Sequence, residues 1–348
     1  MSYPRPMSIS PFNYNFSGLP SQYFQMGMKT PEAMRYSIPG TPGEEQAYPA
    51  TPATPMMDAT PVTSRTLADY EIIKTLGEGG QGAVYLARVR ETGKIIALKV
   101  LKIKNDTILK QARIEIQNLI KISKPSCHPN LSCYYDYFYD SNTRQMLIEM
   151  EYIEGEDLEK WGKRILDSQG SQVLYAYLLA VMIKLLEGLS YVHATNLIHR
   201  DIKPGNIMIS KNEEVKLVDF GLACQTRVCP TSDPDIAYTC CYGKAGTPGY
   251  MAPETIRGES YFATDIWSLG VTIFGLASGN YPFLFSNDPN KTDDENNRQI
   301  LDTILETQPF SLTTSNTKLN LAVNSMLDKN FLNRIQIDPL LKLIRNRN

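Results

Sequence analysis

Three side chains that could act together on a phosphate group lie within six residues of one another. Asp201, Lys203 and Asn206 belong to the stretch His-Arg-Asp-Ile-Lys-Pro-Gly-Asn, which starts at His199. A carboxylate, a cation and an amide at this spacing could accept a proton, neutralise a phosphate and coordinate a metal ion. The same residue types also occur in polar surface turns, so the rest of the chain must decide between the two interpretations.

Apolar segments on both sides predict that this stretch is a loop held between packed elements. A helical pattern with a broad apolar face covers residues 171–194, and strand-like patterns cover 206–209 and 215–218. The second strand ends at Asp219, which Phe220 and Gly221 follow. A carboxylate at the end of an apolar strand can reach a metal ion while the glycine lets the backbone turn.

A glycine-rich hairpin is predicted near residue 80. An alternating strand-like run ends at Leu76, and a β-prone run continues from Val84. Between them Gly77, Gly79 and Gly82 form the pattern Gly-x-Gly-x-x-Gly. In a dinucleotide-binding unit such glycines would open a helix, which this sequence does not do. Glycines at the tip of a hairpin let the backbone close over phosphates without side-chain collisions.

Lys99 and Glu115 are candidates for an ion pair between two further elements. Lys99 follows Ala97 in a predicted strand at 95–100, and Glu115 lies near the middle of a predicted helix at 108–122. A lysine in an apolar strand usually points to solvent because removing its charge from water is costly, and a helix glutamate is usually solvated as well. The paired hairpin favours a phosphate contact for Lys99.

A strand-like run at 146–153 predicts the boundary between two lobes. It contains Met150, Glu151 and Ile153, and Gly155 breaks it before Asp157. An apolar strand that ends in a short polar connector offers backbone groups to which an adenine could hydrogen-bond.

Composition limits the class of protein. The chain has 348 residues, 42% of them hydrophobic, and a net charge of −2. This length predicts one large domain or two small lobes, and the charge gives no reason to expect nucleic-acid binding. The sequence has neither an uninterrupted apolar run of about 18 residues nor the apolar core of a secretory signal. We therefore expect no membrane span and a cytoplasmic protein, with the nucleus as another possible location.

Residues 1–65 differ in composition from the rest and predict a disordered tail. Half of the 22 prolines lie here, and Thr-Pro recurs at Thr30, Thr41, Thr51, Thr54 and Thr60. Proline after each threonine forces extended backbone and removes a donor, so no packed core is expected. Such a segment is either a spacer or a regulatory tail phosphorylated by an upstream proline-directed kinase.

Four of the six cysteines lie close together in a segment, 222–249, that is predicted to be exposed: Cys224, Cys229, Cys240 and Cys241. Metal binding would need two spaced pairs, and the adjacent Cys240 and Cys241 make a poor chelate. Redox control through exposed thiols is an alternative. Without a secretory signal, reduced and unligated thiols are the expected state.

Taken in order, the motifs from about residue 70 to the C-terminus resemble those of the eukaryotic-type protein kinase superfamily. They are the glycine-rich loop, Ala-x-Lys, the helix glutamate, His-Arg-Asp with an asparagine five residues later, Asp-Phe-Gly, Ala-Pro-Glu and Asp-x-Trp-Ser-x-Gly. Lys203 and the Gly246-Thr247-Pro sequence resemble the serine/threonine branch. The resemblance implies an α+β, bilobal protein kinase fold over residues 70–348. A small β-rich N-lobe with one helix (about 70–153) would precede a larger, mainly α-helical C-lobe (about 154–348).

The resemblance implies catalytic roles for four residues. Asp201 would accept the proton of the substrate hydroxyl, and Lys203 would neutralise the transferred phosphoryl group. Lys99, paired with Glu115, would hold the α- and β-phosphates of ATP.

It also implies a site for ATP and Mg²⁺. Asn206 and Asp219 would bind magnesium. Met150 would lie behind the adenine, and Asp157 would contact the ribose. The nucleotide would contact Leu76, Gly77, Gly79, Gly82, Val84, Ala97, Lys99, Met150, Glu151, Ile153, Asp157 and Met208.

Several structural contacts follow from the same resemblance. Glu254 would pair with Arg334, and Asp265, on a buried helix, would hold the catalytic-loop backbone. An apolar column would link the lobes through Leu119, Tyr134, His199 and Phe220. Residues 286–299 are predicted to form a polar loop, and amphipathic segments at 319–327 and 337–344 to close the domain.

The implied activity is that of an ATP-dependent protein serine/threonine kinase with protein substrates. The alternative is a pseudokinase scaffold, but the chain keeps the four residues that pseudokinases typically lose: Lys99, Asp201, Asn206 and Asp219. Arg200 beside Asp201 would misplace the loop until a phosphate in the activation segment neutralises it. The candidate acceptors are Thr226, Thr231, Ser232, Tyr238 and Thr239.

Overall fold

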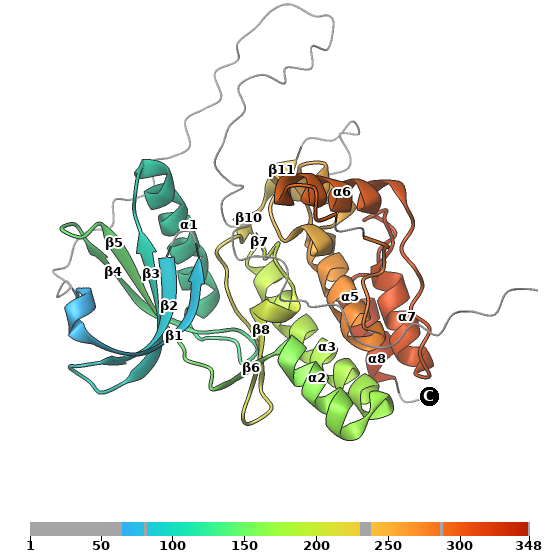
Figure 1. The fold of residues 1–348 in the computed structure, drawn as a ribbon, viewed down its shortest axis with the longest axis horizontal. Helices are drawn as coiled ribbons and strands as arrows, with labels where there is room; N and C mark the ends of the chain where they lie inside the picture. The colour runs from blue at the N-terminus through green and yellow to red at the C-terminus, as the bar shows by residue number, and fades with distance from the viewer. Residues whose placement is uncertain (1–64, 80–81, 230–237, 286–287, 347–348) are drawn as a thin grey trace, which may run out of the picture.

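The protein is represented by a computed structural model that describes residues 65–79, 82–229, 238–285 and 288–346. Apart from Arg65, the predicted Thr-Pro-rich tail lies outside these residues. The chain folds into a β-rich N-lobe and a mainly helical C-lobe, as the resemblance implied (Figure 1).

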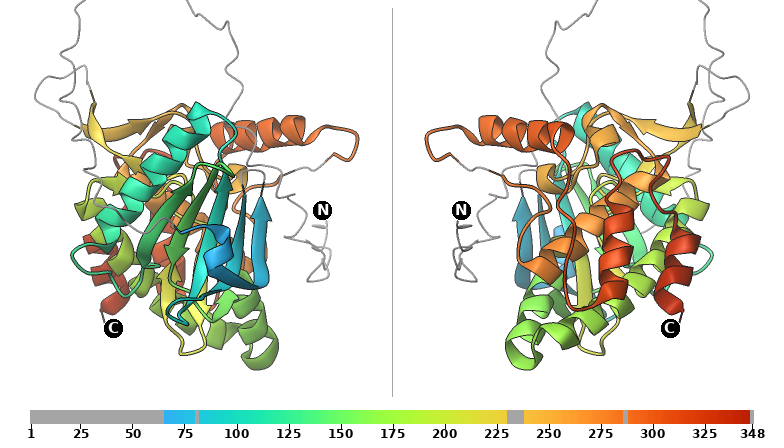
Figure 2. Two further views of the ribbon diagram at one scale, coloured as in Figure 1. Left: turned by 90° about the vertical axis from the view of Figure 1, so that its left-hand side faces the viewer. Right: turned by 90° about the vertical axis from the view of Figure 1, so that its right-hand side faces the viewer.

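The N-lobe is a five-stranded antiparallel sheet with one long helix packed beside it (Figure 2). Its elements are β1 (Tyr70–Gly79), β2 (Gly82–Val89), β3 (Ile95–Lys102), α1 (Asp106–Ser123), β4 (Tyr134–Asp140) and β5 (Gln145–Met150). The strand order is β1-β2-β3-β5-β4. The helix starts after Asn105, whose side chain accepts a hydrogen bond from the Ile108 amide at 3.0 Å. The buried face of α1 includes Glu115 and Leu119, whereas Ile114 is 42% exposed.

Contacts of the N-lobe extend back to Arg65. Its guanidinium pairs with Glu149 at 2.7 Å and with Glu91 at 2.8 Å. The hydroxyl of Tyr70 donates to the same Glu149 carboxylate at 2.6 Å. These bonds tie the chain to β5 five residues before the first predicted strand.

The C-lobe is organised around two apolar helices. Its helices are α2 (Leu158–Gln169), α3 (Ser171–Ala194), α4 (Pro253–Ile256), α5 (Phe262–Ser278), α6 (Asp293–Glu306), α7 (Thr317–Met326) and α8 (Ile337–Arg345). Helix α5 is buried at every residue from Ala263 to Phe274, as its all-round apolar sequence predicts. Helix α3 is long and apolar enough to cross a membrane by length and composition alone. Here α3 packs within the lobe against α2, α5 and α8.

Short strands support the loops between these helices. They are β6 (Gly155–Asp157), β7 (Leu197–Ile198), β8 (Ile207–Ser210), β9 (Val215–Leu217), β10 (Cys224–Gln225), β11 (Arg227–Cys229), β12 (Tyr238–Tyr242) and β13 (Glu259–Ser260). They form the sheets β6-β8-β9, β10-β7 and β11-β12-β13. The predicted strands at 206–209 and 215–218 correspond to β8 and β9.

Two predictions for the C-lobe were wrong. Residues 286–299 are not simply a polar loop, because α6 begins at Asp293. Its start is a capping box, in which Thr292 accepts from the Glu295 amide and Glu295 accepts from the Thr292 amide. The segment 222–249 is not exposed throughout, since β10 to β12 lie in it and Cys240 is fully buried.

All six cysteines form disulfides, which corrects the prediction of reduced thiols. Because adjacent residues of a strand face opposite sides, Cys240 and Cys241 on β12 reach different partners. That pairing depends on which strands become neighbours, which cysteine spacing alone does not show. The bridges are Cys127–Cys133, Cys224–Cys241 and Cys229–Cys240, with Cα separations of 5.7, 6.3 and 5.8 Å.

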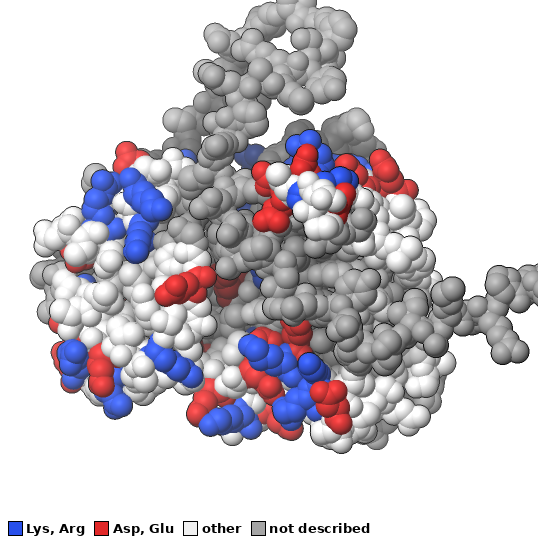
Figure 3. Space-filling view, in the orientation of Figure 1, with Lys and Arg blue, Asp and Glu red and all other residues white. Residues whose placement is uncertain are grey.

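Charged side chains of both signs are interspersed over the face shown in Figure 3. On α2, for example, Lys160 pairs with Asp157 at 2.6 Å, and Arg164 pairs with Glu156 at 2.7 Å. Such a mixed surface fits the small net charge of the chain.

Candidate active site

The carboxylate of Asp201 is the centre of a hydrogen-bonded group just after β7. Asn206 Nδ2 donates to Asp201 Oδ2 at 2.9 Å and to the Asp201 carbonyl at 2.8 Å. Lys203 Nζ lies 2.9 Å from the same Oδ2 atom. The three residues singled out by their spacing are therefore in direct contact, which excludes a plain surface turn.

Thr247 also belongs to the hydrogen-bonded group around Asp201, a contact that was not predicted from the sequence. Its hydroxyl donates to Asp201 Oδ1 at 2.7 Å and accepts from Lys203 Nζ at 2.8 Å. Its amide donates to the same Oδ1 atom at 3.1 Å. The preceding Gly246 has a φ of 122°, and a Cβ atom there would lie 2.7 Å from the Arg200 carbonyl oxygen. The Gly-Thr-Pro sequence was the available signal for this close approach.

Asp265 on α5 fixes the backbone of the loop, as the resemblance implied. It is fully buried and accepts from the amides of His199 and Arg200, each at 2.9 Å. His193 Nε2 lies 2.8 Å from its carboxylate. Burial favours a raised pKa for Asp265, but the contacts with His193 and with His199, including the His199 amide, outweigh it, and the net pKa is lowered. Arg200 is thereby held at a left-handed φ of 66°.

Lys99 lies between two carboxylates that come from different elements. Its Nζ is 2.5 Å from Glu115 on α1 and 3.2 Å from Asp219, which follows β9. Burial alone would lower the pKa of Lys99, but Asp219 and Glu115 raise it above its ordinary value. Lys99 in turn lowers the pKa of Asp219. This arrangement keeps a cation and a carboxylate charged at neutral pH and joins the two lobes.

The predicted nucleotide contacts of the N-lobe lie on neighbouring strands. Val84 on β2 is opposite Lys99 on β3, and Ala97 on β3 is opposite Met150 on β5. A Cβ atom at Gly82 would lie 1.9 Å from a backbone carbonyl of β3, so only glycine fits there. The remaining residues of the hairpin are exposed on β1: Leu76, Gly77 and Gly79.

After β5 the chain runs through a connector, residues 151–154, to β6. Two of the predicted nucleotide contacts in this region, Glu151 and Asp157, have side chains that already bond to other residues. Glu151 pairs with Lys216 at 2.8 Å, so its backbone is the part that remains for an adenine. Asp157 caps α2 by accepting from the Lys160 amide at 2.9 Å. The other predicted contacts here are half-buried: Ile153 and Met208.

The supporting contacts implied by the resemblance are present. Arg334 pairs with Glu254 at 2.6 and 3.1 Å and also donates to the Ala263 carbonyl. The rings of His199 and Phe220 meet edge to face, with centroids 4.8 Å apart. The members of the predicted apolar column are all buried: Leu119, Tyr134, His199 and Phe220.

The donor set fits a magnesium ion that binds together with phosphates. The Nδ2 atom of Asn206 donates both of its hydrogen bonds to Asp201, so the Oδ1 atom of Asn206 is available as a metal ligand. Asp219 supplies an ionised carboxylate, and its neighbour Val218 is bonded to the Asn206 carbonyl at 2.9 Å. Within the described ranges, no cluster of three or more His, Cys, Asp or Glu residues could hold a metal unaided. Mg²⁺ is commonly held by one or two protein oxygens plus substrate phosphates.

The two lobes and these two groups of charged residues define a protein kinase-type domain, and comparisons with known proteins agree. The model of the protein kinase domain family matches residues 70–343, so the chain belongs to this family. It is 34% identical over 220 residues to mitogen-activated protein kinase kinase 2 of Arabidopsis thaliana, covering 63% of this chain and 56% of that protein. It is 32% identical over 290 residues to serine/threonine-protein kinase pakA of Dictyostelium discoideum, covering 77% and 23%.

A third relative is the MAP kinase kinase skh1/pek1 of Schizosaccharomyces pombe. The two chains are 37% identical over 213 residues, which cover 61% of this chain and 54% of that protein. The chain thus spans 23% to 56% of the lengths of these three relatives. The similarity is to protein kinases of the serine/threonine class.

Proposed function

We propose that the chain is an ATP-dependent protein serine/threonine kinase that transfers the γ-phosphoryl group of ATP to hydroxyls of protein substrates. The observation that carries this proposal is the placement of the Asp201 carboxylate. Its two oxygens are held by Lys203, Asn206 and Thr247 at 2.7 to 3.1 Å. A carboxylate that its neighbours already orient can take a proton without first reorganising.

The residues of this group have different roles in phosphoryl transfer. The substrate hydroxyl gives its proton to Asp201 while its oxygen bonds to the γ-phosphorus and the bond to ADP breaks. Lys203 supplies positive charge next to the moving phosphoryl group. The Lys203 ammonium also bonds to Thr247, which keeps it beside Asp201.

On the nucleotide side, Lys99 would hold the α- and β-phosphates while Glu115 keeps its ammonium in place. The glycines of the β1–β2 hairpin would cover the phosphates, and the connector after Met150 would bind the adenine. Asn206 and Asp219 would bind Mg²⁺, which supplies positive charge to the phosphates. With Lys99, Asp201, Asn206 and Asp219 all in place, the geometry does not favour a pseudokinase scaffold.

A peptide-array phosphorylation assay with ATP and Mg²⁺ tests this function. We expect phosphate on serine and threonine peptides, and none when Asp201→Asn protein or excess chelator is used. A matched control is Asp167→Asn, which changes an exposed aspartate on α2. Absence of labelled peptides with the wild-type chain would contradict the proposal, and an Asp201→Asn chain with its full cellular effect would point to a scaffold.

We further propose that phosphorylation in the activation segment raises activity through Arg200. Its Nε donates to the Leu222 carbonyl at 2.8 Å, and burial lowers its pKa to about 10. Among the described residues, no carboxylate pairs with its guanidinium, so a phosphate would supply the missing anion. Thr226 and Thr239 are the described candidates, while Thr231, Ser232 and the Tyr238 side chain lie outside the described residues. Enzyme with its disulfides intact that is as active without phosphate in this segment as with it would contradict this regulation.

The Thr-Pro sites of residues 1–65 suggest an upstream proline-directed kinase as a partner. Alanine at the five Thr-Pro threonines and at Ser10, which precedes Pro11, should abolish phosphorylation of the tail by such a kinase in vitro. If phosphate incorporation is unchanged in that variant, the tail is not its target.

A further inference from the structure

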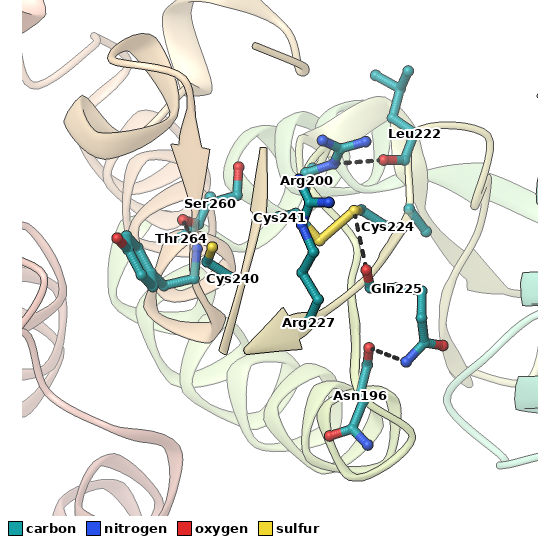
Figure 4. Close-up of a disulfide and its surroundings, with 12 residues drawn as sticks. Asn196, Arg200, Leu222, Cys224, Gln225, Arg227, Cys240, Cys241, Ser260 and Thr264 are labelled. Carbon is teal, nitrogen blue, oxygen red and sulfur yellow. Dashed lines mark hydrogen bonds between the residues drawn. A yellow bond between two sulfur atoms is a disulfide. The ribbon is translucent and has the colours of Figure 1, made fainter. Parts of the chain in front are cut away.

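Two disulfides cross-link the segment between Phe220 and Gly246, and the proposed phosphoryl transfer uses neither of them. Cys224–Cys241 joins β10 to β12, and Cys229–Cys240 joins β11 to β12. Figure 4 shows the first bridge together with the residues around it. Because Cys240 and Cys241 are adjacent on one strand, the two bridges fasten β12 on both of its faces.

At one end, the first bridge is attached to the catalytic loop. In the β10–β7 pairing, Cys224 lies opposite Ile198, the residue directly before His199. Gln225 Nε2 donates to the Asn196 carbonyl at 3.0 Å, at the other end of the same strand pair (Figure 4). The Arg200 side chain bonds to a carbonyl of this segment two residues before Cys224. Displacing β10 would therefore disturb the backbone just before Asp201.

At the other end, the bridge is attached to the base of the C-lobe. Cys241 lies opposite Ser260 on β13, and the buried Ser260 hydroxyl is 3.1 Å from that of Thr255. Downstream of β12 the chain reaches Thr247, which contacts Asp201. The bridge thus connects β10, which supports the catalytic loop, to β12, which leads to Thr247 and its contact with Asp201.

Access to the sulfur atoms is uneven. Cys229, Cys240 and Cys241 are 6%, 0% and 1% exposed, whereas Cys224 is only half-buried. Thiol–disulfide exchange requires a thiolate to reach a sulfur atom, so Cys224 is the point of attack. We expect the second, buried bridge to react only after the first has opened.

We propose that Cys224–Cys241 and Cys229–Cys240 form a redox modification site whose reduction releases the activation segment and lowers phosphoryl transfer. The bridged state is the one in which Thr247, Asp201 and Lys203 are in contact. This inference rests on the proposed kinase function for its activity readout but not for its structural one. The reactant is a dithiol, either a small molecule or a protein with two neighbouring thiols.

The exchange is a balanced two-electron reaction. A thiolate of the dithiol attacks the Cys224 sulfur, which forms a mixed disulfide and releases Cys241 as a thiolate. The second thiol of the reductant attacks the mixed disulfide, releases Cys224 and leaves as a cyclic disulfide. Each released thiolate takes one proton, and both electrons come from the dithiol. Oxidation by a small disulfide reverses the same steps.

The test compares the full chain before and after treatment with dithiothreitol. After reduction and removal of the reagent, kcat/KM for a peptide that the array identifies as an acceptor should fall by about fivefold or more, and oxidised dithiothreitol should restore it. Hydrogen exchange should become faster in β10 and β12, and alkylation should count the released thiols. Fully alkylatable thiols with unchanged activity and unchanged exchange would overturn the proposal.

Serine variants separate these two bridges from the third. The variant Cys224→Ser/Cys229→Ser/Cys240→Ser/Cys241→Ser should have low activity that no longer responds to dithiothreitol, whereas Cys127→Ser/Cys133→Ser should keep the response. If the first variant fails to fold, the wild-type exchange measurement still decides the question. A fall in activity without faster exchange in β10 and β12 would also overturn the proposal. Faster exchange in a chain with no activity in either state would support release of the segment and count against the kinase function instead.

Discussion

The two groups of charged residues at the site are built in different ways. The loop group, Asp201, Lys203 and Asn206, lies within six residues, and its backbone is held by one buried aspartate. The inter-lobe group, Lys99, Glu115 and Asp219, is assembled from β3, α1 and the end of β9, and only side-chain contacts join it. The loop group is therefore fixed by local structure, and the inter-lobe group depends on how three elements are placed.

This difference indicates which structural elements could regulate each group. A movement of α1 would separate Glu115 from Lys99 directly. It would reach the bonds around Asp201 only indirectly, through the hydrogen bond that Asn118 of α1 donates to the Ala223 carbonyl at 2.8 Å. The loop group can be disturbed through the segment that carries Thr247 and the disulfides. Each group thus has its own route of regulation, and substitutions should separate the two.

The largest effect is expected for Asp201→Asn. Removing the proton acceptor should lower kcat by about 100- to 10,000-fold, because an amide cannot take the hydroxyl proton. The KM for ATP should change little. The melting temperature should fall, because an asparagine amide cannot accept all the hydrogen bonds that Asn206 and Thr247 donate to the buried Asp201 carboxylate. Steady-state kinetics and thermal unfolding measure both. A kcat within tenfold of wild type would remove Asp201 from its proposed role.

Lys99→Met should have the next largest effect on catalysis. It removes a member of the inter-lobe group. Loss of the phosphate-binding cation should lower kcat/KM for ATP by about 100-fold, since one such contact is worth that much. The control is Lys102→Met, an exposed lysine on the same strand. Equal losses in both variants would show that the effect is not specific to the inter-lobe group.

Asp265→Asn tests whether the loop group depends on buried support. Loss of a charged acceptor for two amides should reduce the free energy of unfolding by about 1.5 to 3 kcal/mol. Since the pKa of Asp265 is lowered in the fold, its contribution is present above the ordinary aspartate pKa, about 3.9. The difference between wild type and variant should therefore hold at neutral pH and shrink only in acid, as the pH falls through the lower folded pKa. Denaturant unfolding at several pH values measures it, and a difference that grew in acid would have the wrong sign.

Glu115→Gln should have the smallest effect. Lys99 keeps Asp219 at 3.2 Å, so kcat/KM should fall only about tenfold, or about 1.4 kcal/mol. A double-mutant cycle with Lys99→Met should show coupling between the two residues. Additive effects would mean that the inter-lobe group does not act as a unit.

The loop group was predictable because spacing along the chain already placed its members together. For the inter-lobe group, the residues alone made Lys99 and Glu115 candidates for an ion pair, but apolar periodicity could not tell a buried Lys99 from a solvated one. The resemblance decided between the two. The start of α6 was missed although its capping box is local, because the polarity of residues 286–299 suggested a loop. The disulfides were missed because Cys224 and Cys241 meet only when β7, β10 and β12 are assembled.

Arg200 and Asp219 have φ angles of 66° and 61°, a region that glycine enters freely and other residues enter at a cost of about 1 to 3 kcal/mol. Asp265 accepts a hydrogen bond from the Arg200 amide, and Lys99 forms an ion pair with the Asp219 carboxylate. Glycine at either position would relax the backbone and remove the side chain that needs that angle. A search for heat-resistant variants of this domain that ranked folding alone would therefore tend to select these two changes. It would return stable proteins that lack the proposed phosphate response at Arg200 or the proposed Mg²⁺ ligand at Asp219.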